Sequence, residues 1–325
     1  MKIFGFYLIL FSTVIVGQNL EEFEKYFEDA TMRIDYYHVG DSKEEIFTID
    51  RIYRQGIWAG SRKNLIDKFN NGAYYYKIYD LESGNLVFSK GFDSYFKEYQ
   101  TSSNAREGVK RSYHESALIP YPQKSVKLSI EKRDEKNLLS EIYSTIIDPA
   151  DIMIIRETVS EKSVEVTKSL FNGDPHQKLD VAILAEGYTI EEKDKYLNDL
   201  KRFTDILIKY EPYKSLKKNF NVYGVLKPSE ESGVDEPRAN IFKNTSLNAT
   251  FNSLGSERYL LTEDNKSIRD IAANVPYDAI YIMVNHDRYG GGGIYNWTCT
   301  FTTGNQFNEY LFVHEFGHSF AGLAD

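Results

Sequence analysis

The sequence is poor in cysteine, in repeated segments and in long basic or apolar runs. Cys299 is the single cysteine, so no disulfide can form within the chain. Beyond Val16, no segment is long and apolar enough to cross a membrane, and no run of lysine or arginine offers a surface for nucleic acid or anionic lipid. The net charge of -9 also disfavours nucleic acid. These absences leave a globular protein that is stabilised by packing alone.

The N-terminus has the pattern of a secretory signal peptide. Met1 and Lys2 precede a largely apolar stretch that ends at Val16, and the chain turns polar at Gln18. Gly17 is a small residue suited to cleavage, and the apolar stretch is short for an uncleaved anchor. We therefore expect residues 1–17 to be a cleaved signal peptide and the mature protein to be periplasmic, cell-surface or secreted, with no stable membrane insertion.

Residues 24–148 are expected to form an antiparallel β-sandwich. Short, partly alternating apolar segments follow one another there, and Gly72 and Gly84 mark turns between some of them. The expected strands are 32–38, 46–57, 74–79, 86–92, 125–130 and 138–147. Residues 149–175 then form a linker, which contains prolines and a turn-forming Asn-Gly pair. Part of it, 153–166, is alternatively a final strand or a helix packed between the domains.

Residues 176–325 are expected to form an α/β domain, so the chain as a whole belongs to the α+β class. The run 180–185 is a short apolar run after its first residue, Asp180, as in a strand covered on both faces. Thr189 and Glu192 then form a capping box for a helix that ends near Lys209. Further strands are expected at 219–225 and 277–284 and a helix at 268–273. The polar interval 228–264 is either an ordered excursion near the active site or a mobile loop.

The chemistry is concentrated in the run His314-Glu315-Phe316-Gly317-His318. On a helix, histidines four residues apart share one face, which allows two imidazoles to bind one zinc ion. A catalytic zinc site keeps a position open for water, and Glu315 would take the proton of that water as general base. We therefore expect a zinc-dependent hydrolase with one catalytic zinc ion.

A third protein ligand is expected at Asp325. Gly322 is suited to end the helix and turn the chain back towards the metal. Asp325 follows His318 by one residue more than the third ligand of metzincin peptidases does. The predicted metal ligands are thus His314, His318 and Asp325.

Other reactive side chains have simpler interpretations. The strand-like run around Cys299 offers no base, so we expect a buried structural thiol. His286 and Asp287 lack ligand spacing and are expected to be polar surface residues. The glycines at 290–293 form either a flexible turn or bare backbone that a peptide approaches. If 294–301 is the edge strand of the sheet, an extended substrate would pair with it.

Three segments resemble the IgA-peptidase family of secreted zinc metallopeptidases, which is metzincin-like. They are HEFGHSFAGLAD at 314–325, GGGGIYN at 290–296 and LAEGYT at 184–189. The resemblance covers 179–325, and the strand-rich region before it resembles the N-terminal domain of that family. It implies a zincin-like catalytic domain, peptide-bond hydrolysis and secretion, but it does not imply immunoglobulin as the substrate. The family would continue beyond Asp325, so the catalytic domain is expected to be incomplete.

Two functions follow from these observations. The first is a secreted zinc endopeptidase that acts on a protein or peptide substrate and does not bind nucleic acid. The second is an exported protein- or glycan-binding protein in which the histidines hold a structural metal ion. Glu315 distinguishes them, because a structural zinc site needs no general base.

Overall fold

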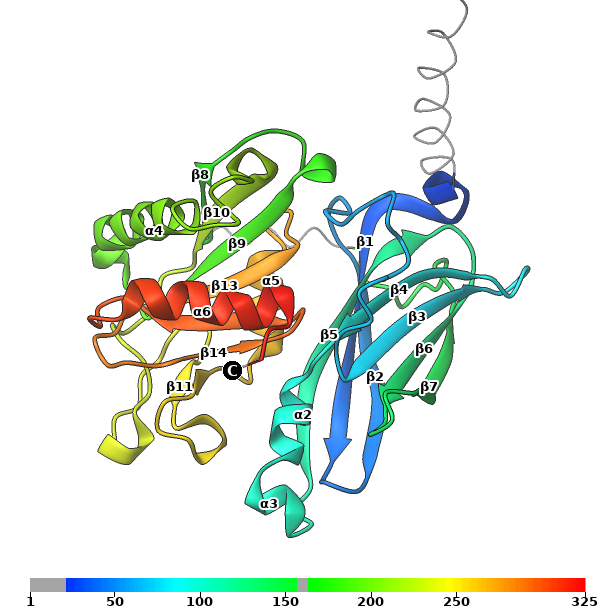
Figure 1. Cartoon of the computed structure of the whole chain (residues 1–325), viewed down its shortest axis with the longest axis horizontal. Coiled ribbons are helices and arrows are strands. Elements are labelled where there is room, and N and C mark those ends of the chain that lie inside the picture. Colours follow the sequence, from blue (N-terminus) through cyan, green and yellow to red (C-terminus); the bar gives the residue numbers. More distant parts are fainter. Residues whose placement is uncertain (1–21, 157–162, 325) are drawn as a thin grey trace, which may run out of the picture.

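Residues 22–156 and 163–324 are described by the structure, which is a computed structural model of the chain. The expected signal peptide at 1–17 therefore lies outside the described residues. Figure 1 shows a strand-rich N-terminal domain beside a second domain in which helices cover a sheet. The fold is mixed α+β, with many strands in several sheets and few helices, in agreement with the expected class. Among the described residues, no helix is long and apolar enough to span a membrane.

The N-terminal domain contains two antiparallel sheets whose inward faces share one core. The first sheet has the order β2-β1-β5, with β1 at Phe27–Gly40, β2 at Glu45–Arg54 and β5 at Arg111–Pro122. The second has the order β4-β3-β6-β7, with β3 at Tyr74–Asp80, β4 at Leu86–Phe92, β6 at Val126–Arg133 and β7 at Leu139–Ile147. Alternate residues of β1, such as Met32 and Ile34, meet Ile78 and Leu128 of the second sheet in this core.

Two short helices, α2 at Tyr95–Gln100 and α3 at Ser103–Arg106, connect the two sheets through the segment before β5. The six strands expected in this region are all present within a few residues of their expected bounds. Strand β5 was not predicted from the sequence, although it pairs with β1 along its whole length. Two features disguised it: Glu115 points into the buried side, and Pro120 and Pro122 close the strand.

The second domain is built on a six-stranded sheet with the order β14-β15-β13-β9-β10-β8. Its strands are β8 at Glu165–Leu170, β9 at Leu179–Glu186, β10 at Phe220–Leu226, β13 at Ala279–Val284, β14 at Gly291–Ile294 and β15 at Thr298–Thr302. The four inner strands run parallel, and β8 and β14 are antiparallel strands at the two edges. The expected strands at 180–185, 219–225 and 277–284 are thereby confirmed.

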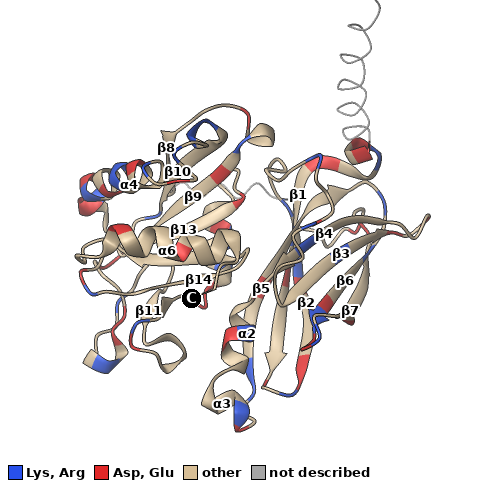
Figure 2. Cartoon of the chain, viewed as in Figure 1, with Lys and Arg blue, Asp and Glu red and all other residues tan. Residues whose placement is uncertain are grey.

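Helices cover both faces of this sheet. On one face, α4 at Lys193–Leu207 and α6 at Asn308–Ala321 pack on alternate residues of the strands, and on the other face α5 at Asn265–Ala272 does so. Figure 2 shows many charged residues on α4 and few on α6. The capping box of Thr189 and Glu192 is formed as expected, and the helix after it ends at Leu207. The remaining short elements are β11 at Thr250–Phe251, β12 at Leu260–Leu261 and 3-10 turns at Pro175–Gln177, Ile190–Glu192, Lys217–Asn219, Pro237–Ala239 and Ser253–Gly255.

The two edges of the sheet are formed by β8 and β14. The predicted linker 149–175 contains β8, so the sheet already begins at Glu165. Because β8 is an edge strand, its polar, partly exposed sequence resembled a connector. The other edge is β14 rather than the segment 294–301. Asn296, with a φ of 54°, helps to reverse the chain so that the glycines of β14 pair outside β15.

The polar interval 228–264 is an ordered excursion, held at the end of β9 by the buried carboxylate of Glu186. Four donors reach this carboxylate from the interval. They are Thr245 Oγ1 at 2.6 Å, Ser246 Oγ at 3.1 Å, Leu247 N at 2.9 Å and Ala249 N at 2.8 Å. Burial raises the pKa of Glu186, and the four hydrogen bonds oppose that shift by stabilising the ionised form.

The two domains are joined by polar contacts through β1, β5 and α5. Arg33 is fully buried, donates to Asp35 at 2.7 Å and 2.6 Å, and reaches Asp270 of α5 at 2.6 Å. Asn265 at the start of α5 donates to Ser116 of β5 at 2.8 Å. A buried guanidinium that bridges both domains is costly to separate, because parting it from Asp270 would leave a buried charge with fewer partners.

Candidate metal centre

Helix α6 carries the motif and is held on the sheet by aromatic stacking. Phe312 and Phe316 lie one turn apart on the same face of the helix. Both stack on Tyr281 of β13, with ring centroids 4.4 Å and 4.9 Å away. The Tyr281 hydroxyl also donates to the carbonyl oxygen of Phe312 at 3.0 Å. This packing turns the opposite side of the helix, which carries His314 and His318, away from the core.

The two histidines of the motif are brought together on that face. His314 and His318 lie about one helical turn apart, and their Nε2 atoms are separated by 3.0 Å. Two nitrogen ligands at about 2.0–2.1 Å from a tetrahedral zinc ion lie roughly 3.3 Å from each other. The two imidazoles are therefore placed as two ligands of one zinc ion would be, and the donor pair fits that metal.

The end of α6 sets the orientation of His318. Gly322 adopts a left-handed φ of 64°, its amide donates to the His318 carbonyl oxygen at 3.0 Å, and the Leu323 amide donates to Gly317 at 3.1 Å. This is the helix-terminating turn that the sequence predicted at Gly322. It places the Leu323 carbonyl oxygen 2.6 Å from Nδ1 of His318. Because a carbonyl only accepts, Nδ1 carries the proton and Nε2 keeps the lone pair that a metal requires.

Replacing Gly322 by alanine is expected to weaken both the fold and the metal site. A left-handed alanine costs about 1–2 kcal/mol, and its Cβ would lie 3.1 Å from the Tyr295 ring. Movement of Leu323 away from His318 is expected to reduce zinc affinity by roughly 10–100-fold. Urea unfolding and zinc titration measure the two effects. Gly84→Ala is the matched control, because Gly84 has a φ of 70° and open space around it. Equal zinc affinity in Gly322→Ala and the parent would show that the turn at Gly322 does not support zinc binding.

Glu315 is buried against the glycines of β14. A Cβ on Gly291 would lie 3.1 Å from its Oε1 atom, and a Cβ on Gly293 would lie 2.5 Å from its backbone oxygen and 2.9 Å from Cβ of His318. A side chain at Gly293 would thus collide with the backbone of α6 at the motif. The glycine run is a strand whose bare backbone lies directly against the motif, which excludes the flexible-turn interpretation.

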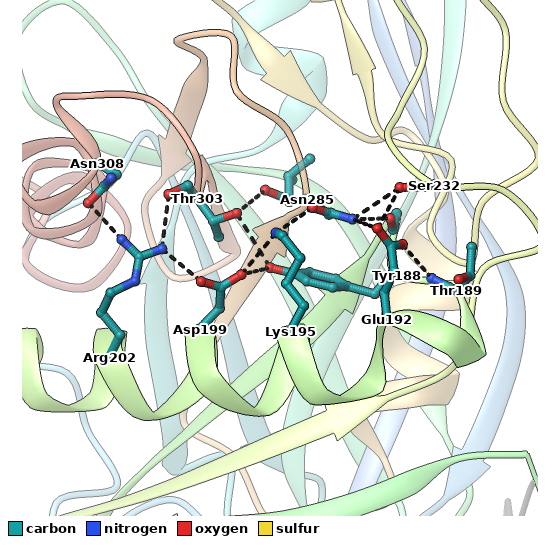
Figure 3. Close-up of polar contacts among 12 residues, drawn as sticks. Tyr188, Thr189, Glu192, Lys195, Asp199, Arg202, Ser232, Asn285, Thr303 and Asn308 are labelled. Atoms are coloured by element: carbon teal, nitrogen blue, oxygen red, sulfur yellow. Dashed lines mark hydrogen bonds and ion pairs between the residues drawn. The ribbon is translucent and has the colours of Figure 1, made fainter.

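A polar network fixes the chain that leads into α6, and Figure 3 shows its members. At its centre is Asp199 of α4, which accepts a hydrogen bond from the buried Tyr188 hydroxyl at 2.8 Å and from Arg202 at 2.8 Å. Arg202 also donates to the Thr303 carbonyl oxygen at 3.0 Å and to Asn308 at 3.3 Å, at the first residue of α6. The network therefore positions the start of the motif helix, as Gly322 positions its end.

The opposite end of this network holds the loop after β9. Lys195 of α4 donates to the Asn285 side-chain oxygen at 2.6 Å, and the Asn285 amide donates to the Gly187 carbonyl oxygen at 2.9 Å and to Glu192 at 3.0 Å. Sequence reasoning missed Asp199, Arg202 and Asn285 because their partners lie far along the chain. The spacing of Asp199 and Arg202 on one side of α4 is the only local signal, and it is typical of any solvated helix.

Asp325, His286 and Cys299 were also considered from the sequence. Asp325 lies outside the described residues, and within the described part of the chain no group of three or more His, Cys, Asp or Glu side chains is arranged to hold a metal ion. His286 lies 3.1 Å from Glu236 through Nε2 and contacts the ring of Phe251, so its imidazole packs against the interval 228–264. Cys299 is fully buried, and burial raises the pKa of its thiol, which makes it a structural residue as expected.

Comparison with known proteins agrees with this geometry. Residues 164–325 match the family described as IgA Peptidase M64, and residues 22–144 match the family described as Peptidase M64 N-terminus. A search among curated proteins finds no match. The two matched ranges correspond to the two domains of the fold, and the range 164–325 includes the whole of α6. The chain therefore belongs to the IgA Peptidase M64 family, whose members are peptidases.

Proposed function

We propose that this chain is an exported zinc-dependent endopeptidase in which His314, His318 and Asp325 hold one zinc ion and Glu315 is the general base. The observation that carries the proposal is the pair of Nε2 atoms 3.0 Å apart on α6, one residue away from a buried carboxylate. Export rests on the apolar stretch before Gly17. We further propose that the N-terminal domain is a β-sandwich and that the catalytic domain is zincin-like.

The side chains divide the work of hydrolysis between them. Zinc, when bound, acts as a Lewis acid towards water and the substrate carbonyl. Glu315 accepts a proton from the attacking water and delivers it to the nitrogen of the leaving amine, so that one carboxylate serves both steps. Its burial against Gly291 and Gly293 limits the movement of that carboxylate and shields it from bulk solvent. Leu323 holds the tautomer of His318 that leaves Nε2 available.

An extended substrate is proposed to lie along β14. This strand is at the edge of the sheet, and its inner side pairs with β15. On the outer side, the Gly291 amide already donates to the Arg258 carbonyl oxygen at 3.2 Å, so pairing with a peptide is proposed for residues 292–294. The space beside Gly292 is filled by Leu261 and the space beside Gly293 by α6, so a peptide is proposed to approach along the outer edge of the strand rather than over its glycines.

Removal of zinc tests the proposal directly. Purified protein treated with 1,10-phenanthroline is expected to lose hydrolysis of a denatured-protein or peptide-library substrate, because Glu315 alone cannot polarise the scissile bond. Activity should return when zinc is added after the chelator is removed. Mass spectrometry of the products measures cleavage, and a non-chelating isomer, 1,7-phenanthroline, is the control. Full cleavage by the metal-free protein would refute a zinc peptidase.

A further inference from the structure

A cavity of about 820 Å³ lies between the two domains. Its walls come from the loop after β2, from β4 and from the chain that joins α5 to β13, and they include the aromatic rings of Trp58, Tyr76 and Tyr277. The HEFGH residues themselves are not part of its lining. The cavity is large enough for an organic molecule with a ring, and ring-lined cavities of this size are typical of small-molecule sites.

Two cations from different domains line this cavity without a hydrogen-bonding partner. Arg269 of α5 is only 4% exposed, and its Nε atom is buried and unsatisfied. Lys90 of β4 faces the same space. Among residues 22–156 and 163–324, neither side chain donates a hydrogen bond or forms an ion pair, and the one close partner of Arg269 is the ring of Tyr277 at 5.9 Å. A buried guanidinium without an acceptor is costly, so its retention calls for a partner that binds.

The carboxylates around the cavity do not supply that partner. Asp67 accepts from the amides of Gly91 and Phe69 at 2.9 Å and 2.8 Å, and Asp93 accepts from an amide at 2.7 Å. Asp278 accepts from an amide at 2.9 Å, and burial raises its pKa. Glu115, the fourth carboxylate of the lining, is held by His38 and the Phe96 amide. Each of these carboxylates thus has at least one hydrogen-bonding partner among the described residues, whereas the side chains of Arg269 and Lys90 have none there.

Lys90 interacts electrostatically with both the carboxylates of the cavity and the guanidinium of Arg269. Burial lowers the pKa of Lys90, Asp278 and Asp67 oppose the shift, and the neighbouring charge of Arg269 adds to it. Two like charges held near each other in a partly dry cavity repel, and an anion between them would relieve both the repulsion and the lost hydration.

We propose that the cavity between the domains is a binding site for a small organic carboxylate with a ring, whose carboxylate pairs with Arg269 and Lys90 and whose ring packs on Trp58, Tyr76 and Tyr277. The buried Tyr277 hydroxyl and the Gln55 amide, which are also unsatisfied, line the same cavity and offer further hydrogen bonds to the ligand. Because the site takes residues from both domains, its ligand would also join them. The cavity reaches the end of α6 at Phe320 and Ala321, but its lining does not include His314, Glu315 or His318, and the proposal does not rest on the peptidase chemistry.

Isothermal titration calorimetry of the full chain tests the site with two carboxylates of different origin. D-glucuronate represents acidic sugars, and hippurate represents acylated amino acids; D-glucose and hippuramide are their neutral counterparts. At least one carboxylate is expected to bind saturably, while its neutral counterpart does not, because only the charged form pairs with Arg269. Inorganic sulfate is the third probe. Binding of sulfate alone, equal binding of a neutral counterpart, or no binding of either carboxylate would overturn the proposal.

Variants then assign the binding to this cavity. Arg269→Gln is expected to weaken the carboxylate that binds by at least about tenfold, the effect of losing a charge-assisted hydrogen bond. Arg238→Gln, at an exposed arginine outside the cavity, should leave binding unchanged. In the absence of ligand, Arg269→Gln should not lower Tm, since it removes an unsatisfied buried charge. Lys90→Met provides a second variant with the same expectations. Unchanged affinity in both variants, or a Tm loss in both, would show that these cations are structural.

Discussion

Glu315→Gln is expected to reduce kcat for peptide cleavage by about 10²–10⁴-fold while zinc remains bound. Glutamine has nearly the same shape as glutamate but cannot take a proton from water. The position is buried beside Gly291 and Gly293, which leaves no room for another side chain to replace the carboxylate. Rates with a quenched fluorescent peptide measure the effect, and zinc analysis of the same sample shows whether the metal is retained.

The same variant separates the two functions that the sequence allowed. In a binding protein with a structural metal ion, the carboxylate has no task, so Glu315→Gln would leave all properties unchanged. A matched control is Glu309→Gln, which alters an exposed carboxylate of the same helix that pairs with Lys209. Cleavage that persists undiminished in Glu315→Gln would contradict the proposed mechanism. A loss of zinc in the variant would instead indicate that Glu315 supports the ligands.

The parts of the fold that the sequence predicted are those with strong local patterns. The run at 180–185 is buried on both faces of the sheet, and the apolar sequence that follows Asp180 is typical of such a strand. Thr189 and Glu192 form a capping box from side chains three residues apart, which a short window contains in full. Gly322 ends α6 for an equally local reason, because only a residue without a Cβ adopts its φ at little cost.

The parts that were missed depend on contacts between distant residues. Glu115 made β5 look irregular, but it is buried because its carboxylate lies 3.2 Å from Nδ1 of His38 and accepts from the Phe96 amide at 3.2 Å. Likewise, Arg202 meets Asn308 only after the sheet has formed. A polar residue at a buried position is a poor signal in one sequence, since its partner cannot be named until the fold brings both together.

In the candidate site, too, the features with a local sequence pattern were predicted and those that depend on distant contacts were not. The pairing of His314 with His318 follows from helical spacing and was predicted from five residues. The close approach of Gly293 to the backbone of Glu315 depends on how β14 packs on α6, and the sequence offered only the glycines themselves. The sequence left open whether 294–301 is the edge strand, because the reversal near Asn296 that places β14 at the edge has no strong turn sequence.

His314→Ala is expected to abolish stable zinc binding, and with it all peptide cleavage. Removing a direct ligand should cost more than the roughly 10–100-fold in affinity that is typical of an outer partner, because the ion loses one of its few bonds to the protein. Competition with a chromogenic chelator measures the affinity. Zinc should also raise the Tm of the parent protein, since an ion that binds the folded state stabilises it, and this rise should vanish in the variant.

His286→Ala is the matched control for this result. Its imidazole contacts Glu236 and Phe251 rather than the histidine pair, so its removal should leave zinc affinity unchanged. The fold of His314→Ala should persist without zinc, because Phe312 and Phe316 hold α6 on Tyr281 from the opposite side of the helix. Zinc that binds equally well to His314→Ala and to the parent would place the metal elsewhere in the chain. An equal loss in His286→Ala would show that the loop of Glu236 also supports the ion.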